Sequence, residues 1–407
     1  MNETALGVIG LVLLLGLFLT GMEMAVAMAV IGFVGYALVV SPGAAMSILA
    51  NDFYDSFESY SLTVVPLFVL MGQIAFNAGI ARQLYDSANK FLGHIPGGLA
   101  MATVAGATLF KAICGSIAAT CATFASVAVP EMDRYNYSKK LSTGIVATVG
   151  TLGVLIPPSV ILILLGIITQ QSIGKLFLAG LVPGLIIALF FAVIIFGWAR
   201  INPEIGPASK RYTWKARAAS LPPVIWPMII FLIIIGGLMK GFFTPTEAGS
   251  IGTFAVFVLC VAKRELSFTG FRKSLREALR TSCMVLMLVA SSAVLGHFVA
   301  VTDIPNDIGE WIVNLPLHRH MVMSLIFLVY LFDAYFSFVI LESVAPEFCS
   351  PITLTINGFL DDETAKLVVT LFFKNNLFTV CLSESIAFRA DAEDFNVFAL
   401  DSENVLF

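Results

Sequence analysis

Two adjacent prolines, Pro157 and Pro158, lie inside an apolar run that is long enough to cross a membrane, Leu141 to Ile168. Because proline lacks an amide hydrogen and disfavours the α conformation of the residue before it, one continuous helix cannot pass through this point. The sequence therefore predicts two half-helices with opened backbone between them. In hydrocarbon, free backbone groups are tolerated only where protein buries them or where they line a wet cavity, and secondary transporters build ion and substrate sites in this way. The alternative is a proline kink that only shapes helix packing.

The composition is that of a polytopic membrane protein, because 58% of the 407 residues are hydrophobic and only 12% are charged. A chain of this length has room for roughly ten crossings. The lipid bilayer is therefore an expected partner, and no nucleic acid is expected. The six cysteines lack paired spacing, which indicates neither a disulfide framework nor a zinc site. The N-terminus has no positively charged region of the signal-peptide type, so we expect its first apolar run to stay as a span.

The charges between the apolar runs predict the topology. The acidic stretch 41–60 contains no Lys or Arg and should be an outward-facing loop, whereas the basic segments 200–219 and 263–280 should face inward. This places the N-terminus on the outer side. Residues 79–95 have an amphipathic pattern suited to lying along the inner membrane surface. Ordinary spans are expected at residues 6–20, 22–40, 61–77, 176–199, 221–239, 247–262, 282–301 and 322–341.

Residues 97–129 are 33 residues between two basic segments, and all of them except Lys111 are apolar or small. Two full crossings would need about 40 residues and a turn, so a re-entrant hairpin of two short helices fits better. Its tip is expected at 113–120, where glycine, serine, alanine and threonine allow close backbone approach. The alternative is a small-residue packing seam between ordinary helices. Lys111 lies one turn before the tip, and both a functional role and snorkelling from a shallow position are open for it.

Residues 332–407 differ from the rest of the chain. They hold twelve acidic and three basic residues, a net charge of −9, so that residues 1–331 carry −4 minus −9, or +5. Runs such as Asp361-Asp362-Glu363 are incompatible with the hydrocarbon layer. This tail is either an acidic appendage or sequence that does not belong to the fold.

Six motifs follow one another along the chain, and the resemblance that they carry covers roughly residues 1–330. They are VPLFVLMG at 65–72, FKAICGSIAAT at 110–120, VPEM at 129–132, TLGVLIPPS at 151–159, LFLAGLVPG at 176–184 and FTPTEAG at 243–249. In this order they resemble the large membrane subunit (DctM-like) of the tripartite ATP-independent periplasmic (TRAP) transporters.

The resemblance implies an all-α, elevator-type secondary transporter with a re-entrant hairpin and broken helices, in which a mobile domain carries two inverted-repeat hairpins. It implies sodium as the coupling ion and no other cofactor, in a multi-pass protein of the bacterial inner membrane. It also implies a small organic acid as substrate, a periplasmic solute-binding protein that delivers it, and a small four-helix membrane subunit. By position, the residues that would bind sodium and the substrate carboxylate are Gly115, Ser116 and Thr120 at the hairpin tip and Gly150, Thr151, Pro157 and Pro158 in the broken helix.

The resemblance divides the chain into a membrane domain, residues 1–331, and the tail. The domain would contain a first repeat at about 61–199, an inner loop at 200–219 and second-half spans at 221–331. Because residues 332–407 contain no second proline pair, the second inverted repeat should be incomplete. A transport-inactive membrane scaffold or a truncated copy of such a permease is therefore the alternative to a working transporter. An intramembrane enzyme is disfavoured, because the predicted spans lack clusters of His, Asp and Glu.

Overall fold

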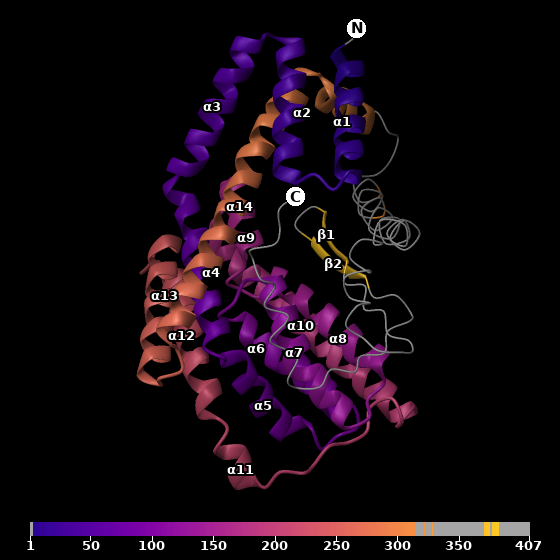
Figure 1. Ribbon diagram of the computed structural model, residues 1–407, viewed down its shortest axis with the longest axis vertical. Helices are drawn as coiled ribbons and strands as arrows, with labels where there is room; N and C mark the ends of the chain where they lie inside the picture. The colour runs from indigo at the N-terminus through magenta and orange to yellow at the C-terminus, as the bar shows by residue number, and fades with distance from the viewer. Residues whose placement is uncertain (1–2, 314–320, 322–327, 329–369, 375–376, 382–407) are drawn as a thin grey trace. The chain divides into compact units, whose positions relative to one another are not determined.

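The computed structural model describes residues 3–313, 321, 328, 370–374 and 377–381 (Figure 1). The chain forms two compact units, Met1–Ile308 and Gly309–Phe407. The first unit is built of helices, which confirms the predicted all-α polytopic architecture. Five helical segments of the described residues are long and apolar enough to cross a bilayer, namely Tyr60–Asn77, Ile173–Ile201, Trp214–Lys240, Pro245–Ala262 and Phe268–Val301. The protein is therefore a multi-pass membrane protein.

The helices begin and end close to most of the predicted spans. They are α1 (Glu3–Leu19), α2 (Met24–Val39), α3 (Pro42–Glu58), η1 (Tyr60–Thr63), α4 (Val64–Asn77), α5 (Ile80–Leu92), α6 (Gly98–Lys111), α7 (Ile117–Arg134), α8 (Lys139–Thr151), η2 (Leu152–Val154), α9 (Val160–Ile168), α10 (Ile173–Ile201), α11 (Trp214–Ala218), α12 (Pro222–Lys240), α13 (Pro245–Ala262), α14 (Phe268–Val301) and α15 (Ile304–Val313).

The surface of α10 shows why these helices need a bilayer. Leu189, Phe190 and Ile194 are 65%, 60% and 60% exposed. A water-soluble protein rarely presents such a continuous apolar surface, whereas a membrane span does so because lipid tails cover it.

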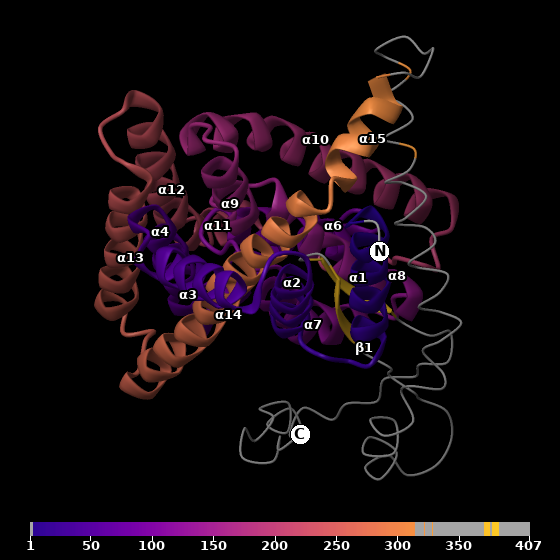
Figure 2. The ribbon, with the colours of Figure 1, turned by 90° about the horizontal axis from the view of Figure 1, so that it is seen from above.

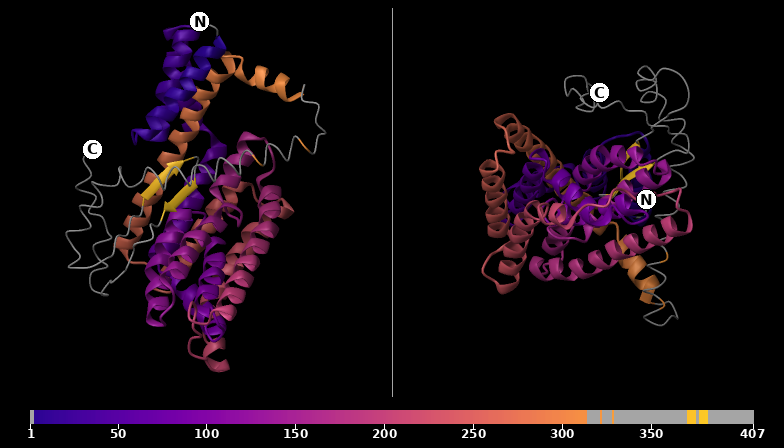
Figure 3. Two further views of the ribbon diagram at one scale, coloured as in Figure 1. Left: turned by 90° about the vertical axis from the view of Figure 1, so that its right-hand side faces the viewer. Right: turned by 90° about the horizontal axis from the view of Figure 1, so that it is seen from below.

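Helix α14 is the longest of the elements that the structure describes, and it contacts α2, α3 and α4 (Figure 2). Its approach to α2 is close, because a Cβ on Gly32 would lie 2.7 Å from the backbone nitrogen of Leu295. Asp52 of α3 pairs with His297 of α14, with 3.4 Å between Oδ1 and Nε2. Figure 3 shows α1–α3, in indigo, gathered near one end of α14 and the magenta helices α6–α10 gathered away from that end.

Helix α6 is enclosed by α5, α7, α8 and α10. Three aromatic side chains fill the space between α5, α6 and α7. Tyr85 and Phe110 both meet the ring of Phe124 edge-on, with centroids 6.4 and 6.3 Å away. Such edge-to-face pairs stabilise by about 0.5–1.5 kcal/mol beyond the area they bury. The apolar face of α5 is therefore covered by protein.

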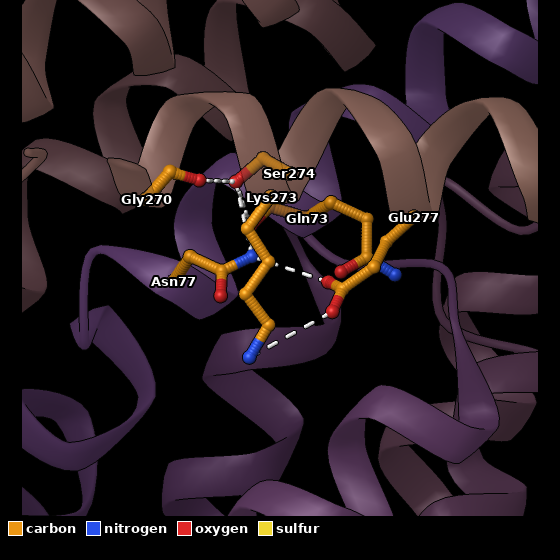
Figure 4. A network of polar contacts seen from close by, with 6 residues as sticks. All are labelled: Gln73, Asn77, Gly270, Lys273, Ser274 and Glu277. Carbon is orange, nitrogen blue, oxygen red and sulfur yellow. Dashed lines mark hydrogen bonds and ion pairs between the residues drawn. The ribbon is translucent and has the colours of Figure 1, made fainter. Parts of the chain in front are cut away.

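A polar network joins the C-terminal end of α4 to the N-terminal part of α14 (Figure 4). The Asn77 amide donates to the Ser274 hydroxyl at 3.0 Å and to the Glu277 carboxylate at 3.3 Å. The buried Ser274 hydroxyl is also 3.0 Å from the carbonyl oxygen of Gln73. Because polar groups between apolar helices must be paired, the network fixes the register of α4 on α14.

Ser274→Ala should lower the free energy of unfolding by about 1 kcal/mol, because it removes a buried hydroxyl that serves both helices. Thermal unfolding of the detergent-solubilised protein would measure this. Ser292→Ala is the matched control on the same helix, since the exposed Ser292 hydroxyl has, among the described residues, the Val289 carbonyl of its own helix as its bonding partner. Equal midpoints for the two variants would contradict the prediction.

One prediction about the first unit is wrong, and the structure extends two others. Residues 41–60 are not a loop, because α3 occupies most of them. The predicted span 282–301 is only the second part of α14, which begins at Phe268 within the basic segment. Residues 79–95 do form an amphipathic helix, but α5 packs against α4, α6, α7, α11 and α12 rather than only along a membrane surface.

The predicted span 322–341 and most of the tail lie outside the described residues. In the tail, β1 (Thr370–Lys374) and β2 (Leu377–Cys381) pair antiparallel, with Thr370 opposite Cys381 and Lys374 opposite Leu377. The other regular elements among the described residues are helices. The proposed division into a domain of residues 1–331 and a tail stays a prediction.

Candidate ion and substrate site

The apolar run with the two prolines is interrupted, as predicted. Helix α8 ends at Thr151, the short turn η2 follows, and α9 begins only at Val160. The intervening backbone, residues 155–159, is not helical, and the peptide bond between Pro157 and Pro158 is cis. Both prolines are buried. The break is therefore enclosed by protein, which is the condition under which opened backbone is stable in a membrane.

The predicted pair of helices within residues 97–129 is also present. Helices α6 and α7 contact each other and are joined by residues 112–116. Ser116 begins α7 as its N-cap, since its hydroxyl accepts the backbone N–H of Ala119 at 3.3 Å. The 14 residues of α6 extend roughly 21 Å, less than the thickness of the hydrocarbon core. The re-entrant insertion of this pair stays a prediction.

The turn between α6 and α7 abuts the break after α8. A Cβ on Gly115 would lie 2.5 Å from the carbonyl oxygen of Pro158 and 3.6 Å from the Cα of Ser159. A Cβ on Gly150 would overlap the sulfur of Cys121 on α7. The structure thus places Gly115 against the backbone of the break that contains Pro157 and Pro158, whereas Gly150 packs against the Cys121 side chain of α7. Neither glycine leaves room for a larger residue without a shift of its neighbours.

We call the place where the turn, residues 112–116, meets the break, residues 155–159, the junction. The carbonyl oxygen of Ser116 accepts two side-chain hydrogen bonds there. It accepts the Lys111 amine at 2.9 Å and the Thr120 hydroxyl at 2.9 Å. Lys111 and Thr120 are both fully buried. Thr151, by contrast, is exposed, and its hydroxyl donates to the Thr148 carbonyl of its own helix at 2.7 Å. The hydroxyls of Ser116 and Thr120 are therefore bonded within the first turn of α7, and the Thr151 hydroxyl is bonded within α8.

Ser159 was not among the predicted site residues. Its side chain is 1% exposed, and its hydroxyl has no hydrogen-bond partner in the described part of the chain. Ser159 stands at the N-cap position of α9, directly after the proline pair and before an apolar run. That order of residue types is a helix-start signal and could have identified it. A buried hydroxyl without a partner costs free energy, so it marks a place where a ligand can bond.

Helix ends of like polarity meet in pairs at the junction. The N-termini of α7 and α9 meet where Gly115 lies against Pro158 and Ser159. The C-terminal end of α6 and the turn η2 that follows α8 meet where Lys111 lies against Gly153. Helix N-termini carry partial positive charge and C-termini partial negative charge. One side of the junction therefore favours an anion and the other side favours a cation.

A cation at this place would be held by backbone and hydroxyl oxygens. In the described part of the chain, no group of three or more His, Cys, Asp or Glu side chains could hold a metal ion. Hard cations such as sodium take oxygen ligands, by analogy with calcium and magnesium. The donor set near Ser116 and Thr120 fits a hard monovalent cation better than a transition metal.

Comparison with known proteins places these features in a family. A model described as "Tripartite ATP-independent periplasmic transporter, DctM component" matches residues 11–344. The chain is 36% identical to the C4-dicarboxylate TRAP transporter large permease protein DctM of Pseudomonas aeruginosa, over 72% of this chain and 68% of that one. The corresponding protein of Rhodobacter capsulatus is 30% identical, over 77% and 74%. The 2,3-diketo-L-gulonate TRAP transporter large permease protein YiaN of Escherichia coli is 32% identical, over 70% and 67%.

Proposed function

Because the chain belongs to the DctM family of tripartite ATP-independent periplasmic transporter components, we propose that it is the membrane permease of a sodium-coupled importer of a small organic acid. A periplasmic solute-binding protein would deliver the acid, and a small four-helix membrane subunit would complete the complex. The permease would lie in the bacterial inner membrane, with its N-terminus in the periplasm. This is a transport role, and no enzymatic reaction is proposed.

The observation that carries the proposal is the pairing of helix ends at the junction. The N-termini of α7 and α9 suit a carboxylate, and the buried Ser159 hydroxyl offers it a hydrogen bond. The ends of α6 and η2 suit a cation. Discontinuous helices that present N-termini to an anion and C-termini to sodium are the arrangement by which secondary transporters couple the two.

A carboxylate is proposed as the substrate class. Three similar permeases are named for C4-dicarboxylate or for 2,3-diketo-L-gulonate. Junction contacts from Gly115, Pro158 and Ser159 would accommodate the charged group these compounds share. The junction would recognise the carboxylate, and other parts of the complex would recognise the rest of the substrate.

The test is uptake of a labelled dicarboxylate by proteoliposomes that hold the permease with its two partners. Replacing sodium by choline should reduce uptake more than tenfold. Ser159→Ala should raise the KM about tenfold, because a hydrogen bond to a charged group is worth about 1.5–3 kcal/mol. Ser142→Ala is the matched control, since the buried Ser142 hydroxyl bonds within α8 to the Lys139 carbonyl. Sodium-independent uptake would refute the coupling, and an unchanged KM in Ser159→Ala would refute the assignment of the carboxylate.

A transport-inactive scaffold is the second candidate. The family match ends at residue 344, and the tail that follows carries acidic runs that no membrane span tolerates. The same proteoliposomes distinguish the two functions. A complex that assembles with its partners at normal stoichiometry but takes up no substrate in a sodium gradient would favour the scaffold.

A further inference from the structure

Lys111 is a buried lysine at the end of α6, and its side chain extends across the junction to the N-cap residue of α7. The Lys111 side chain is 0% exposed. Apart from Lys111, residues 98–129 contain no charged residue, and residues 141–168 contain none at all. Within the described residues, its amine has one hydrogen-bond partner, the carbonyl oxygen of Ser116 at 2.9 Å. The end of the lysine chain lies against Gly153, where a Cβ would be 2.6 Å from Cε.

A charge buried in this way needs compensation, because moving an ammonium out of water costs several kcal/mol. No carboxylate of the two segments is available, since neither contains Asp or Glu. In the described part of the chain the compensation comes from the Ser116 carbonyl and from the partial negative charge at the ends of α6 and η2. A backbone oxygen and a field of this kind would also attract a free monovalent cation.

We propose that the Lys111 ammonium is a tethered cation that occupies the position of one sodium ion at this junction. The inference rests on the proposed function, because it concerns the number of sodium ions that the site takes up. With Lys111 in place, the junction would bind one sodium ion fewer than it would with a small residue at position 111. The hairpin turn and the broken segment would then stay together at this point without sodium.

A substrate carboxylate is the other ligand that an ammonium could bind. The amine of Lys111 is not assigned this role, because it already has the Ser116 carbonyl as a hydrogen-bond partner. The unpartnered hydroxyl of Ser159 lies instead at the helix N-termini, on the anion side of the junction. Lys111 is hydrogen-bonded to the protein's own backbone, as a structural cation would be.

Lys111→Ala removes the charge and leaves room for an ion, whereas Lys111→Met removes the charge and fills the space. The full-length protein is purified in sodium chloride and transferred to sodium chloride or choline chloride of equal concentration. Relative to the wild type, Lys111→Ala should gain an extra sodium-dependent rise of about 3 °C in unfolding midpoint, when sodium is at roughly ten times its dissociation constant. Lys111→Met should gain none.

An equal sodium response in the wild type and in Lys111→Ala would overturn the proposal, as would an equal gain in Lys111→Met. If Lys111→Ala yields no folded protein in either salt, the same comparison on Lys111→Ser decides, because serine also leaves space and adds an oxygen ligand. Uptake is measured separately on the wild type. Sodium-dependent uptake without a gain in Lys111→Ala refutes the tethered cation alone, and sodium-independent uptake refutes the proposed coupling.

Discussion

Gly115→Val is expected to reduce sodium-dependent uptake by about 100-fold. Any Cβ at this position would lie 2.5 Å from the carbonyl oxygen of Pro158, and a backbone oxygen cannot rotate away as a side chain can. Overpacking of this kind costs about 1–3 kcal/mol, and the upper figure corresponds to roughly 100-fold in the population of the closed junction. Uptake of labelled dicarboxylate and the unfolding midpoint of the purified protein would both be measured.

Gly144→Val is the control for this prediction. Gly144 lies on α8, and a Cβ there would meet no atom within 4 Å. The same change of residue type should therefore leave uptake within about twofold, because glycine to valine in a helix interior changes propensity by only a few tenths of a kcal/mol. If both variants transport like the wild type, then the contact between the hairpin turn and the broken segment does not matter for function.

Gly153→Val is expected to destabilise the protein by about 2 kcal/mol, and the loss should disappear when Lys111 is replaced by alanine. The lysine chain occupies the space next to Gly153. An exposed lysine would swing away at little cost, but this side chain is fully buried and would lose its bond to the Ser116 carbonyl. In Lys111→Ala the new valine fills the space that the lysine leaves.

A double-mutant cycle measures the effect. The wild type, the two single variants and the double variant are unfolded in the same detergent, and the coupling free energy between positions 111 and 153 should be about 1–3 kcal/mol. Gly174→Val with Lys111→Ala is the matched cycle, because Gly174 lies near Leu238 of α12 and not near Lys111. Additive losses at 111 and 153 would contradict the packing described here.

The interrupted helix could be predicted from the sequence, because the effect of Pro157 and Pro158 on the backbone is local. The pair α6 and α7 could be predicted from length and small residues for the same reason. Contacts across the junction could not. The small residues around Gly115 predicted a hairpin tip, but nothing local identified the Pro158 carbonyl as its contact, since that contact arises only when distant segments pack.

The errors elsewhere have a related cause. Charge distinguishes water from lipid but not helix from loop, so Asp52, Asp55 and Glu58 suggested a loop where α3 forms. A start signal was present, because the Ser41 hydroxyl accepts the Ala44 N–H at 3.3 Å and Pro42 occupies the first turn. The basic residues after Lys263 likewise concealed the beginning of α14, whose N-cap is Ser267. The burial of Lys111 could not be predicted, because a lysine near a helix end can equally well reach the membrane surface.

The unbroken length of α14 has a mechanical consequence. Ser274, which is bonded to α4, and Phe298, which packs against Gly10 of α1 and Gly35 of α2, are 24 residues apart on one helix, roughly 36 Å along its axis. A stiff rod pivoting by about 10° at the first point would carry the second through roughly 6 Å. A small swing of α4 is thus amplified into a displacement larger than one helical turn at the opposite end, where the first two helices must follow it.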